Sequence, residues 1–350
     1  MNPLPGSHRR KVVVAAAILA LAAAWLVYSS GGDKSFDWRL FRDTVAGLDW
    51  VWLAAGLAAA FGTYLARALR WAVLLEPVKA HPSFQRLLSA TIIGYAAVTA
   101  LGRAAEMVRP YLIANKEHVP FASQLAAWIV ERIYDILFSL AVFGFAVSEI
   151  SGSGVRTGPA LSWALRLGGV IIALGAAAGL AVLLAMRYRG AHIQNWLLRS
   201  LGFLAKHNFE RAERLTAAFL DGVSCTRSRT ATLRLIGYTF VEWVLIAACY
   251  ACVLNAFGGV LYPSWVSIAI LMGFVSFGSL VQLPAVGGGT QVTAVLVLTQ
   301  IFGVPIEAAT GIGVVLWFLM FAAVLPVGVG LAIREGLTWA GLREAERGSL

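Results

Sequence analysis

The sequence predicts an all-α polytopic membrane protein with about six full crossings and two opposed re-entrant helical hairpins, arranged as a possible inverted repeat. Composition is the first reason, because 59% of the 350 residues are hydrophobic and only 13% are charged, whereas soluble domains carry about 25% charged residues. Length is the second, because several apolar runs reach the ~20 residues that a transmembrane helix needs. A topology with eight crossings and one hairpin is the alternative.

Charge and cysteine content narrow the function. The net charge of +10 is typical of basic cytoplasmic loops facing anionic inner-leaflet lipids, so we expect no nucleic-acid partner. Cys249 and Cys252 have C-x-x-C spacing but lie in an apolar run, which argues against a redox or metal site. No nucleotide-binding, hydrolase or kinase motif occurs. We therefore expect no cofactor and no metal.

The first elements are a span and an outer loop. Basic residues precede the apolar run 12–27, which places the N-terminus in the cytoplasm. Residues 29–49 form a polar connector without excess positive charge, as expected of an outer loop. The next span is 51–75, with Arg67 and Arg70 in its last turns. These arginines either snorkel to the inner interface or line the mouth of a cavity.

The apolar arm that follows is too short for an ordinary crossing. We interpret 84–114 as a hairpin that enters and leaves on the cytoplasmic side. The span 121–147 then carries Glu131, Arg132 and Asp135. Glu131 lies about 15 Å deep at 1.5 Å per residue. These three residues either neutralise one another between helices or face the arginines of the hairpin.

The second half repeats this plan. A span at 160–186 leads to a basic segment, and the span 235–257 contains Glu242. Residues 264–302 are interpreted as a hairpin entering from outside, and 308–333 as the last span. The parts of this single transmembrane domain, residues 1–350, are the first span and outer loop (1–49), the first half (50–187), the basic cytoplasmic segment (188–233), the second half (234–334) and the cytoplasmic tail (335–350).

The stretch after Gly102 is the main candidate site. Arg103, Glu106 and Arg109 recur every three residues, so on a helix they share one face. Pro110 lacks the N–H that would bond the carbonyl of Glu106. Ionisable residues at membrane depth mark functional sites, and we expect this break to bind a lipid headgroup. The alternative is that the arginines hold the inner interface while Glu106 caps a short helix.

A second break resembles the first. Its residues are Pro284, Gly287, Gly288, Gly289 and Gln291. Glycines expose backbone N–H groups that can form an anion-binding nest, or they simply allow flexibility and close helix packing.

Together these features resemble the transmembrane region of lysyl-phosphatidylglycerol synthases, which also occurs alone in bacterial and archaeal flippase-like domain proteins. The resemblance covers roughly 51–333 and includes Arg67, Arg70, Trp71, Gly102, Arg103, Glu106, Arg109, Glu131, Arg132, Asp135 and the late Pro-plus-Gly break. It implies a multi-pass protein of the bacterial or archaeal cell membrane that moves a phospholipid between leaflets. The soluble aminoacyl-transferase domain is missing, so synthesis of lysyl-lipid is not implied. The family's glycine-rich break usually ends in a glutamate, where this chain has Gln291 and Thr293.

Translocation of a phospholipid or related anionic lipid is therefore the expected function, without catalytic residues. The expected headgroup-binding residues are Arg67, Arg70, Arg103, Glu106 and Arg109, with Glu131, Arg132, Asp135 and Glu242 as their charge partners. One alternative is a membrane enzyme acting on a lipid phosphate with Glu131 or Asp135 as base. The other is a non-catalytic subunit of a separate lipid-modifying transferase.

Overall fold

The computed structural model describes residues 36–152, 174–181, 217–218, 222, 228–258, 260–279, 282–283 and 287–336. The predicted first span, most of the predicted span 160–186, nearly all of the basic segment, Pro284 and most of the C-terminal tail lie outside the described residues. The elements of the first half are α2 (Trp38–Ala46), α3 (Trp50–Leu75), α4 (Phe84–Leu101), η1 (Arg103–Met107), α5 (Val108–Glu117) and α6 (Phe121–Gly152). Those of the second half are α9 (Arg229–Ala256), α10 (Trp265–Gly278), β1 (Gln282–Leu283), β2 (Gly287–Gly288), α11 (Gly289–Gln300), α12 (Ile306–Trp317), η3 (Phe318–Ala322) and α13 (Val324–Arg334).

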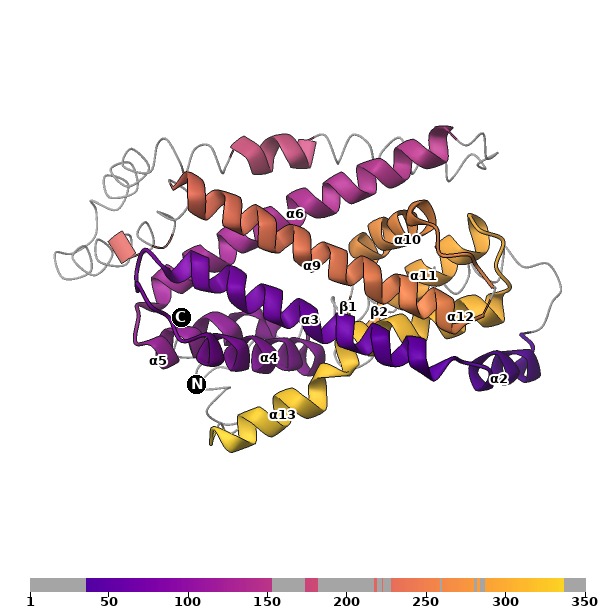
Figure 1. The fold of residues 1–350 in the computed structure, drawn as a ribbon, viewed down its shortest axis with the longest axis horizontal. Helices are drawn as coiled ribbons and strands as arrows, with labels where there is room; N and C mark the ends of the chain where they lie inside the picture. Colours follow the sequence, from indigo (N-terminus) through magenta and orange to yellow (C-terminus); the bar gives the residue numbers. More distant parts are fainter. Residues whose placement is uncertain are drawn as a thin grey trace, which may run out of the picture.

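The described residues are almost entirely helical, and the helices run along the long axis of the molecule (Figure 1). Five of them are long and apolar enough to span a membrane: Trp50–Leu75, Phe84–Leu101, Phe121–Ile150, Arg229–Ala256 and Ile306–Arg334. The expectation that the arm beginning at residue 84 is too short to cross is therefore wrong, because its helix continues to Leu101. The two short strands form one antiparallel pair in which Gln282 faces Gly288. The chain is therefore an all-α multi-pass membrane protein, as predicted.

Helices α3 and α9 form the longest pairing, and small residues allow their backbones to come close. A Cβ added at Gly56 would lie 3.3 Å from the Cβ of Cys252, and one at Gly62 would lie 3.3 Å from Leu245. Glycine at such positions is the usual means of close helix packing in membranes, where water does not drive helices together. This pairing holds α3 and α9 side by side and so determines the relative positions of their charged residues.

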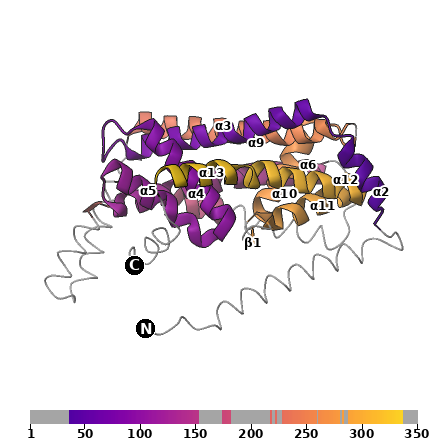
Figure 2. The ribbon, with the colours of Figure 1, turned by 90° about the horizontal axis from the view of Figure 1, so that it is seen from below.

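Two pairs of shorter helices approach from opposite ends of the molecule. Helices α4 and α5 lie together at one end, and α10 and α11 lie together at the other, as the views agree (Figures 1 and 2). The turn η1 joins the first pair and the strands β1 and β2 lie between the second. We call these pairs the α4–α5 hairpin and the α10–α11 hairpin.

The break after α4 differs from the expected one. Gly102 ends α4 with a φ of 80°, a conformation that strongly favours glycine. Arg103 and Glu106 then lie in a 3₁₀ turn, and Pro110 falls in the first turn of α5, where helix N–H groups have no intrahelical acceptor. Arg103 and Glu106 therefore do not share one helix with Arg109, as their spacing had suggested, because the helix is interrupted before α5 begins.

The connector before α3 contains a helix that the sequence did not predict, α2. Asp37 caps α2 by accepting from the N–H groups of Arg39 at 2.8 Å and Leu40 at 3.1 Å. Its own N–H donates to Glu307 of α12 at 3.1 Å, so the connector is attached to the second half of the chain.

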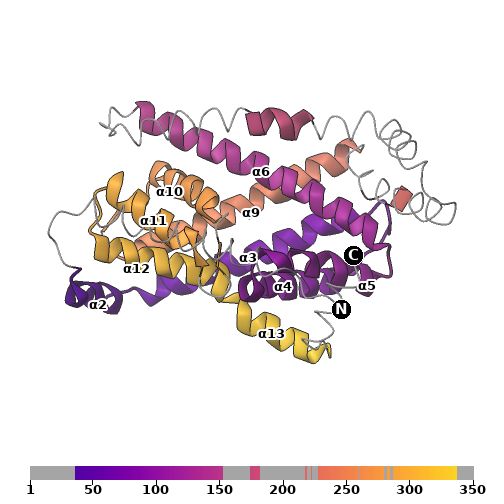
Figure 3. The same cartoon turned by 180° about the vertical axis from the view of Figure 1, so that it is seen from behind.

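The last predicted span is bent rather than straight. A π-helical turn, η3, separates α12 from α13, and the N–H of Ala323 bonds the carbonyl of Phe318. The chain changes direction there (Figure 3). Helix α12 packs against α11, and α13 packs against α4, so this span contacts both hairpins.

Candidate functional site

A buried arginine lies where α3, α6 and α9 meet. Arg70 has no exposed surface. Its guanidinium donates to Glu131 at 2.7 Å and to Asp135 at 2.5 Å, and it lies 3.1 Å from Glu242. Thr239 accepts a further hydrogen bond at 3.2 Å. Arg70 therefore ties the carboxylates of α6 and α9 to α3, and it does not snorkel to an interface.

Arg109 reaches one of these carboxylates, Glu131, from the α4–α5 hairpin. It donates to the two oxygens of Glu131 at 2.9 and 3.0 Å, and its guanidinium carbon lies 4.1 Å from the centre of the Trp71 ring. The approach depends on Gly94 of α4, because a Cβ there would lie 2.6 Å from the Cβ of Arg109. Of the two arginines expected opposite Glu131, only Arg109 contacts it.

Two further arginines share one tyrosine. Arg67 donates to Glu242 at 2.7 Å, and its guanidinium carbon lies 4.3 Å from the centre of the Tyr95 ring. Arg132 lies 3.1 Å from Asp135, the pairing expected from their spacing, and donates to the Tyr95 hydroxyl at 3.3 Å. Tyr95 therefore has Arg67 close over its face, Arg109 farther from it at 5.6 Å, and Arg132 at its hydroxyl.

These residues form what we call the charge cluster. In the described part of the chain it contains four arginines and three carboxylates, namely Arg67, Arg70, Arg109, Arg132, Glu131, Asp135 and Glu242. Buried charges are tolerated only when they are paired and hydrogen-bonded, and each carboxylate here has an arginine within 3.1 Å. The described cluster nevertheless keeps one formal positive charge.

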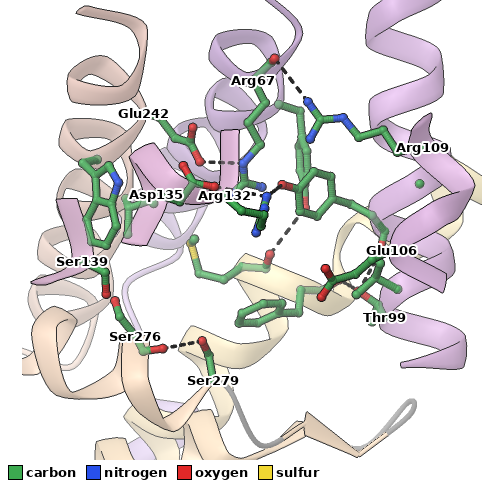
Figure 4. A pocket seen from close by; sticks show the side chains of 18 of the residues that line it. Arg67, Thr99, Glu106, Arg109, Arg132, Asp135, Ser139, Glu242, Ser276 and Ser279 are labelled. Carbon is green, nitrogen blue, oxygen red and sulfur yellow. Dashed lines mark hydrogen bonds and ion pairs between the residues drawn. The ribbon is translucent and has the colours of Figure 1, made fainter. Parts of the chain in front are cut away.

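A cavity of about 340 Å³ opens beside the charge cluster. Charged side chains line one part of it and hydroxyl groups another (Figure 4): the first are Arg67, Arg109, Arg132, Asp135 and Glu242, and the second are Ser139, Ser276 and Ser279. Two lining residues, Arg103 and Ile136, have exposed side chains, and they mark its open side. Ile136 lies near the middle of α6.

The tips of the two hairpins meet at this open side. Arg103 of η1 donates to the carbonyl of Ser279, which follows α10, at 3.1 Å. Its only ion pair among the described residues is with Glu106, at 3.4 Å. The two breaks therefore contact one another directly, and Arg103 is the least tightly paired arginine around the cavity.

The glycine run of the second break builds a turn. Gly288 has a φ of 104°, a conformation that favours glycine, and its N–H donates to the side-chain oxygen of Gln291 at 2.7 Å. Gly287 and Gly288 also pair with β1. The cavity lining includes none of the described glycines of this run and does not include Gln291. Gln291 thus holds the turn at the position where an acid was expected from the resemblance.

The predicted site residues fall into two groups, those that line the cavity and those buried behind its wall. Arg67, Arg103, Glu106, Arg109, Arg132, Asp135 and Glu242 line it, whereas Arg70 and Glu131 lie behind its wall. Gly102 shapes the tip. The sequence analysis missed the uncharged lining residues, among them Tyr95, Thr99, Ser139, Trp243, Ser276 and Ser279. On α6 a signal existed, because Ser139 follows Arg132 and Asp135 at the spacing of one helix face.

Comparison with known families agrees with this picture. The family model described as the lysylphosphatidylglycerol synthase TM region matches residues 12–328. The chain belongs to this family. Searches of curated proteins and of solved structures gave no match. Membership of the lysylphosphatidylglycerol synthase TM region family links this multi-pass membrane protein to phospholipid metabolism.

Proposed function

We propose that the protein translocates a phospholipid or related anionic lipid between the membrane leaflets. The observation that carries this proposal is the arginine-lined cavity of about 340 Å³ at the point where two hairpins from opposite ends meet. Transporters built from opposed broken helices place their substrate site near the bilayer midplane. Non-helical backbone at that depth is tolerated where it lines a cavity or is buried in protein, and η1 satisfies that condition.

Arg103 and Arg132 are the proposed phosphate ligands. Both line the cavity, and their side chains retain 47% and 35% of their accessible surface. The rigid fork of a guanidinium suits the oxygens of a phosphate. Arg70, which is fully buried, positions Glu131 and Asp135 instead, and these in turn hold Arg109 and Arg132 at the wall.

We further propose that both hairpins are re-entrant and that the α4–α5 end faces the cytoplasm. Among the described residues, the element bounds put more basic residues at that end (Lys79, Arg86, Lys116, Arg229, Arg234 and Arg334) than acidic ones (Glu76, Glu117 and Glu335), whereas at the other end Asp37, Asp43, Asp49, Glu149 and Glu307 outnumber Arg39 and Arg42. Cytoplasmic loops carry the excess of Lys and Arg. This orientation also places both chain termini in the cytoplasm, if the predicted first span crosses once.

We propose no catalytic role for the carboxylates of the charge cluster. A general base needs a carboxylate that can take up a proton, but Glu131, Asp135 and Glu242 each accept from arginine. A separate lipid-modifying transferase is compatible with this proposal. It would act as a partner that supplies or consumes the lipid, while this protein transports the lipid through the cavity.

The test is translocation in liposomes that contain the purified protein. Labelled phosphatidylglycerol should become accessible to a membrane-impermeant quencher faster than in empty liposomes. Ser276→Trp, which fills the cavity, should slow this rate, whereas Ser148→Trp on the exposed surface of α6 should not. Equal rates in protein-containing and empty liposomes would refute translocation.

A further inference from the structure

The cavity has a second polar region besides the charge cluster. Three serines line it, Ser139 from α6, Ser276 from α10 and Ser279 directly after α10. Figure 4 shows them in the part of the cavity that lies away from Arg67 and Arg109. We call these three residues the hydroxyl face. Because it is uncharged, it distinguishes headgroups by their hydrogen-bonding groups and not by their charge.

Two residues of the hydroxyl face keep free acceptor capacity. Ser276 donates its hydroxyl proton to the carbonyl of Met272 at 2.7 Å, and Ser279 donates to the carbonyl of Ser276 at 2.7 Å. A serine hydroxyl has one donor and two acceptor lone pairs. Both oxygens have therefore spent their donor and can still accept a hydrogen bond from a ligand.

Ser139 has both functions left. Ser148 of the same helix donates to the carbonyl of Phe145 at 2.7 Å, whereas the half-buried hydroxyl of Ser139 has no hydrogen-bond partner among the described residues. It lines the cavity. A polar group withdrawn from water without a partner is unfavourable, and a ligand hydroxyl in the cavity would supply that partner.

The hydroxyl face adjoins the proposed phosphate ligands. On α6 the guanidinium of Arg132 lies 3.1 Å from Asp135, and Ser139 follows Asp135 by four residues on the same face, about 6 Å along the helix axis. On the other side Arg103 donates to the carbonyl of Ser279 at 3.1 Å. A phosphate held by these two arginines therefore leaves the next part of the headgroup beside the serines.

The hydroxyl groups of a headgroup need such partners during passage. Burying a hydroxyl without a hydrogen bond is costly, so a site that offers no partner should move a hydroxylated headgroup more slowly than an alkyl headgroup of the same charge. Hydroxyl acceptors beside the phosphate reverse this order. The order of the two rates is therefore diagnostic.

We infer that Ser139, Ser276 and Ser279 form a subsite for the hydroxyl groups of a polyol headgroup, which is either a glycerol or a ring polyol such as a sugar. The inference rests on the proposed translocation function. It adds to that function a recognition of the headgroup that is independent of charge.

The experiment compares three lipids that carry the same fluorescent acyl chain and the same single negative charge in the same proteoliposomes: phosphatidylglycerol, phosphatidylinositol and phosphatidylmethanol. Only the last has no hydroxyl beyond its phosphate. The wild-type protein should move at least one of the two polyol lipids about fivefold faster than phosphatidylmethanol, the factor that a net hydrogen bond of about 1 kcal/mol gives. A faster rate for phosphatidylglycerol identifies glycerol as the occupant, and a faster rate for phosphatidylinositol identifies a ring polyol.

Alanine variants assign the effect to the hydroxyl face. In Ser139→Ala and Ser276→Ala the ratio of the polyol-lipid rate to the phosphatidylmethanol rate should fall to one or below. Ser148→Ala is the matched control, because its hydroxyl lies on the exposed surface of the same helix, and it should keep the wild-type ratio. Reading the ratio separates recognition of the headgroup from damage to the fold, which lowers both rates together.

The outcomes are distinct. Equal rates for all three lipids in the wild-type protein, or a wild-type ratio in both Ser139→Ala and Ser276→Ala, would overturn the hydroxyl subsite and leave translocation standing. A ratio that falls equally in Ser148→Ala would overturn its assignment to the cavity. Failure to move any of the three lipids faster than empty vesicles would overturn translocation as well.

Discussion

Arg109 and Glu131 form a bidentate ion pair, in which each of two guanidinium nitrogens donates to a different carboxylate oxygen, at 2.9 and 3.0 Å. The pair joins the α4–α5 hairpin to α6 in the interior of the protein. Arg109→Met should lower the free energy of unfolding by about 3 kcal/mol, because two charge-assisted hydrogen bonds to Glu131 are lost together with the contact of the guanidinium with Trp71. An SDS titration of the purified protein measures this loss.

The control for that prediction is the exposed pair of Arg234 and Glu76. Arg234→Met should cost less than about 1 kcal/mol, as surface ion pairs do. If both methionine variants lose the same stability, the buried pair is not what holds the hairpin to α6.

Arg103 should matter for transport more than for stability. Arg103→Ala removes a cavity arginine with a half-exposed side chain, so its free energy of unfolding should change by less than about 1 kcal/mol. Its rate of lipid translocation should fall about tenfold or more, the loss expected for a charge-assisted hydrogen bond of about 1.5 kcal/mol or more. Arg86→Ala is the matched control, since Arg86 is exposed and lies away from the cavity. A normal rate in Arg103→Ala would remove Arg103 from the site.

Gly94 should be intolerant of even one added carbon. In Gly94→Ala the new Cβ would lie 2.6 Å from the Cβ of Arg109, so α4 and α5 must separate. We expect a loss of about 1–3 kcal/mol in stability and slower translocation, because Arg109 leaves its place. Gly237→Ala meets nothing within 4 Å and should leave both quantities unchanged. Wild-type behaviour of Gly94→Ala would show that the hairpin packs differently.

Single cysteines in a protein whose three native cysteines are replaced can test the topology. Tyr262→Cys and Pro305→Cys flank the α10–α11 hairpin and should both react with an impermeant maleimide from outside the cell. Arg86→Cys and Lys116→Cys, which lie in the first turn and the last turn of the first hairpin, should react only after the inner face is opened. Labelling of Tyr262→Cys and Pro305→Cys from opposite sides would mean that the segment crosses the membrane instead of returning.

The sequence predicted the long helices well because their apolar runs are continuous. The expected span 51–75 corresponds to α3, Trp50–Leu75. The expected span 235–257 corresponds to α9, Arg229–Ala256, which begins a few residues earlier than expected. Helix α2 was missed because its pattern is polar and short, and its position depends on the contact of Asp37 with Glu307, a residue far along the chain. Local pattern carries no information about such a contact.

The charges of the site were predictable, but its pairing was not, apart from the local pair of Arg132 with Asp135. Glu131, Arg132, Asp135 and Glu242 stand out because acids and arginines are rare in apolar spans. Which arginine pairs with which carboxylate depends on how α3, α5, α6 and α9 pack. The central position of Arg70 could therefore not be predicted from the sequence. Tyr95 was overlooked for the same reason, since an aromatic residue in a membrane helix gives no signal until two arginines are found around it.

The π-helical turn Phe318–Ala322 gives the last span a fulcrum. Its carbonyls are engaged from the first half of the chain, since Tyr64 donates to Met320 and Thr99 donates to Phe321. One arm of the span rests on α11 and the other on α4. Because both hairpins bear on one bent helix, we expect a tilt of either tip to be transmitted to the other through this five-residue turn, of which Met320 and Phe321 line the cavity.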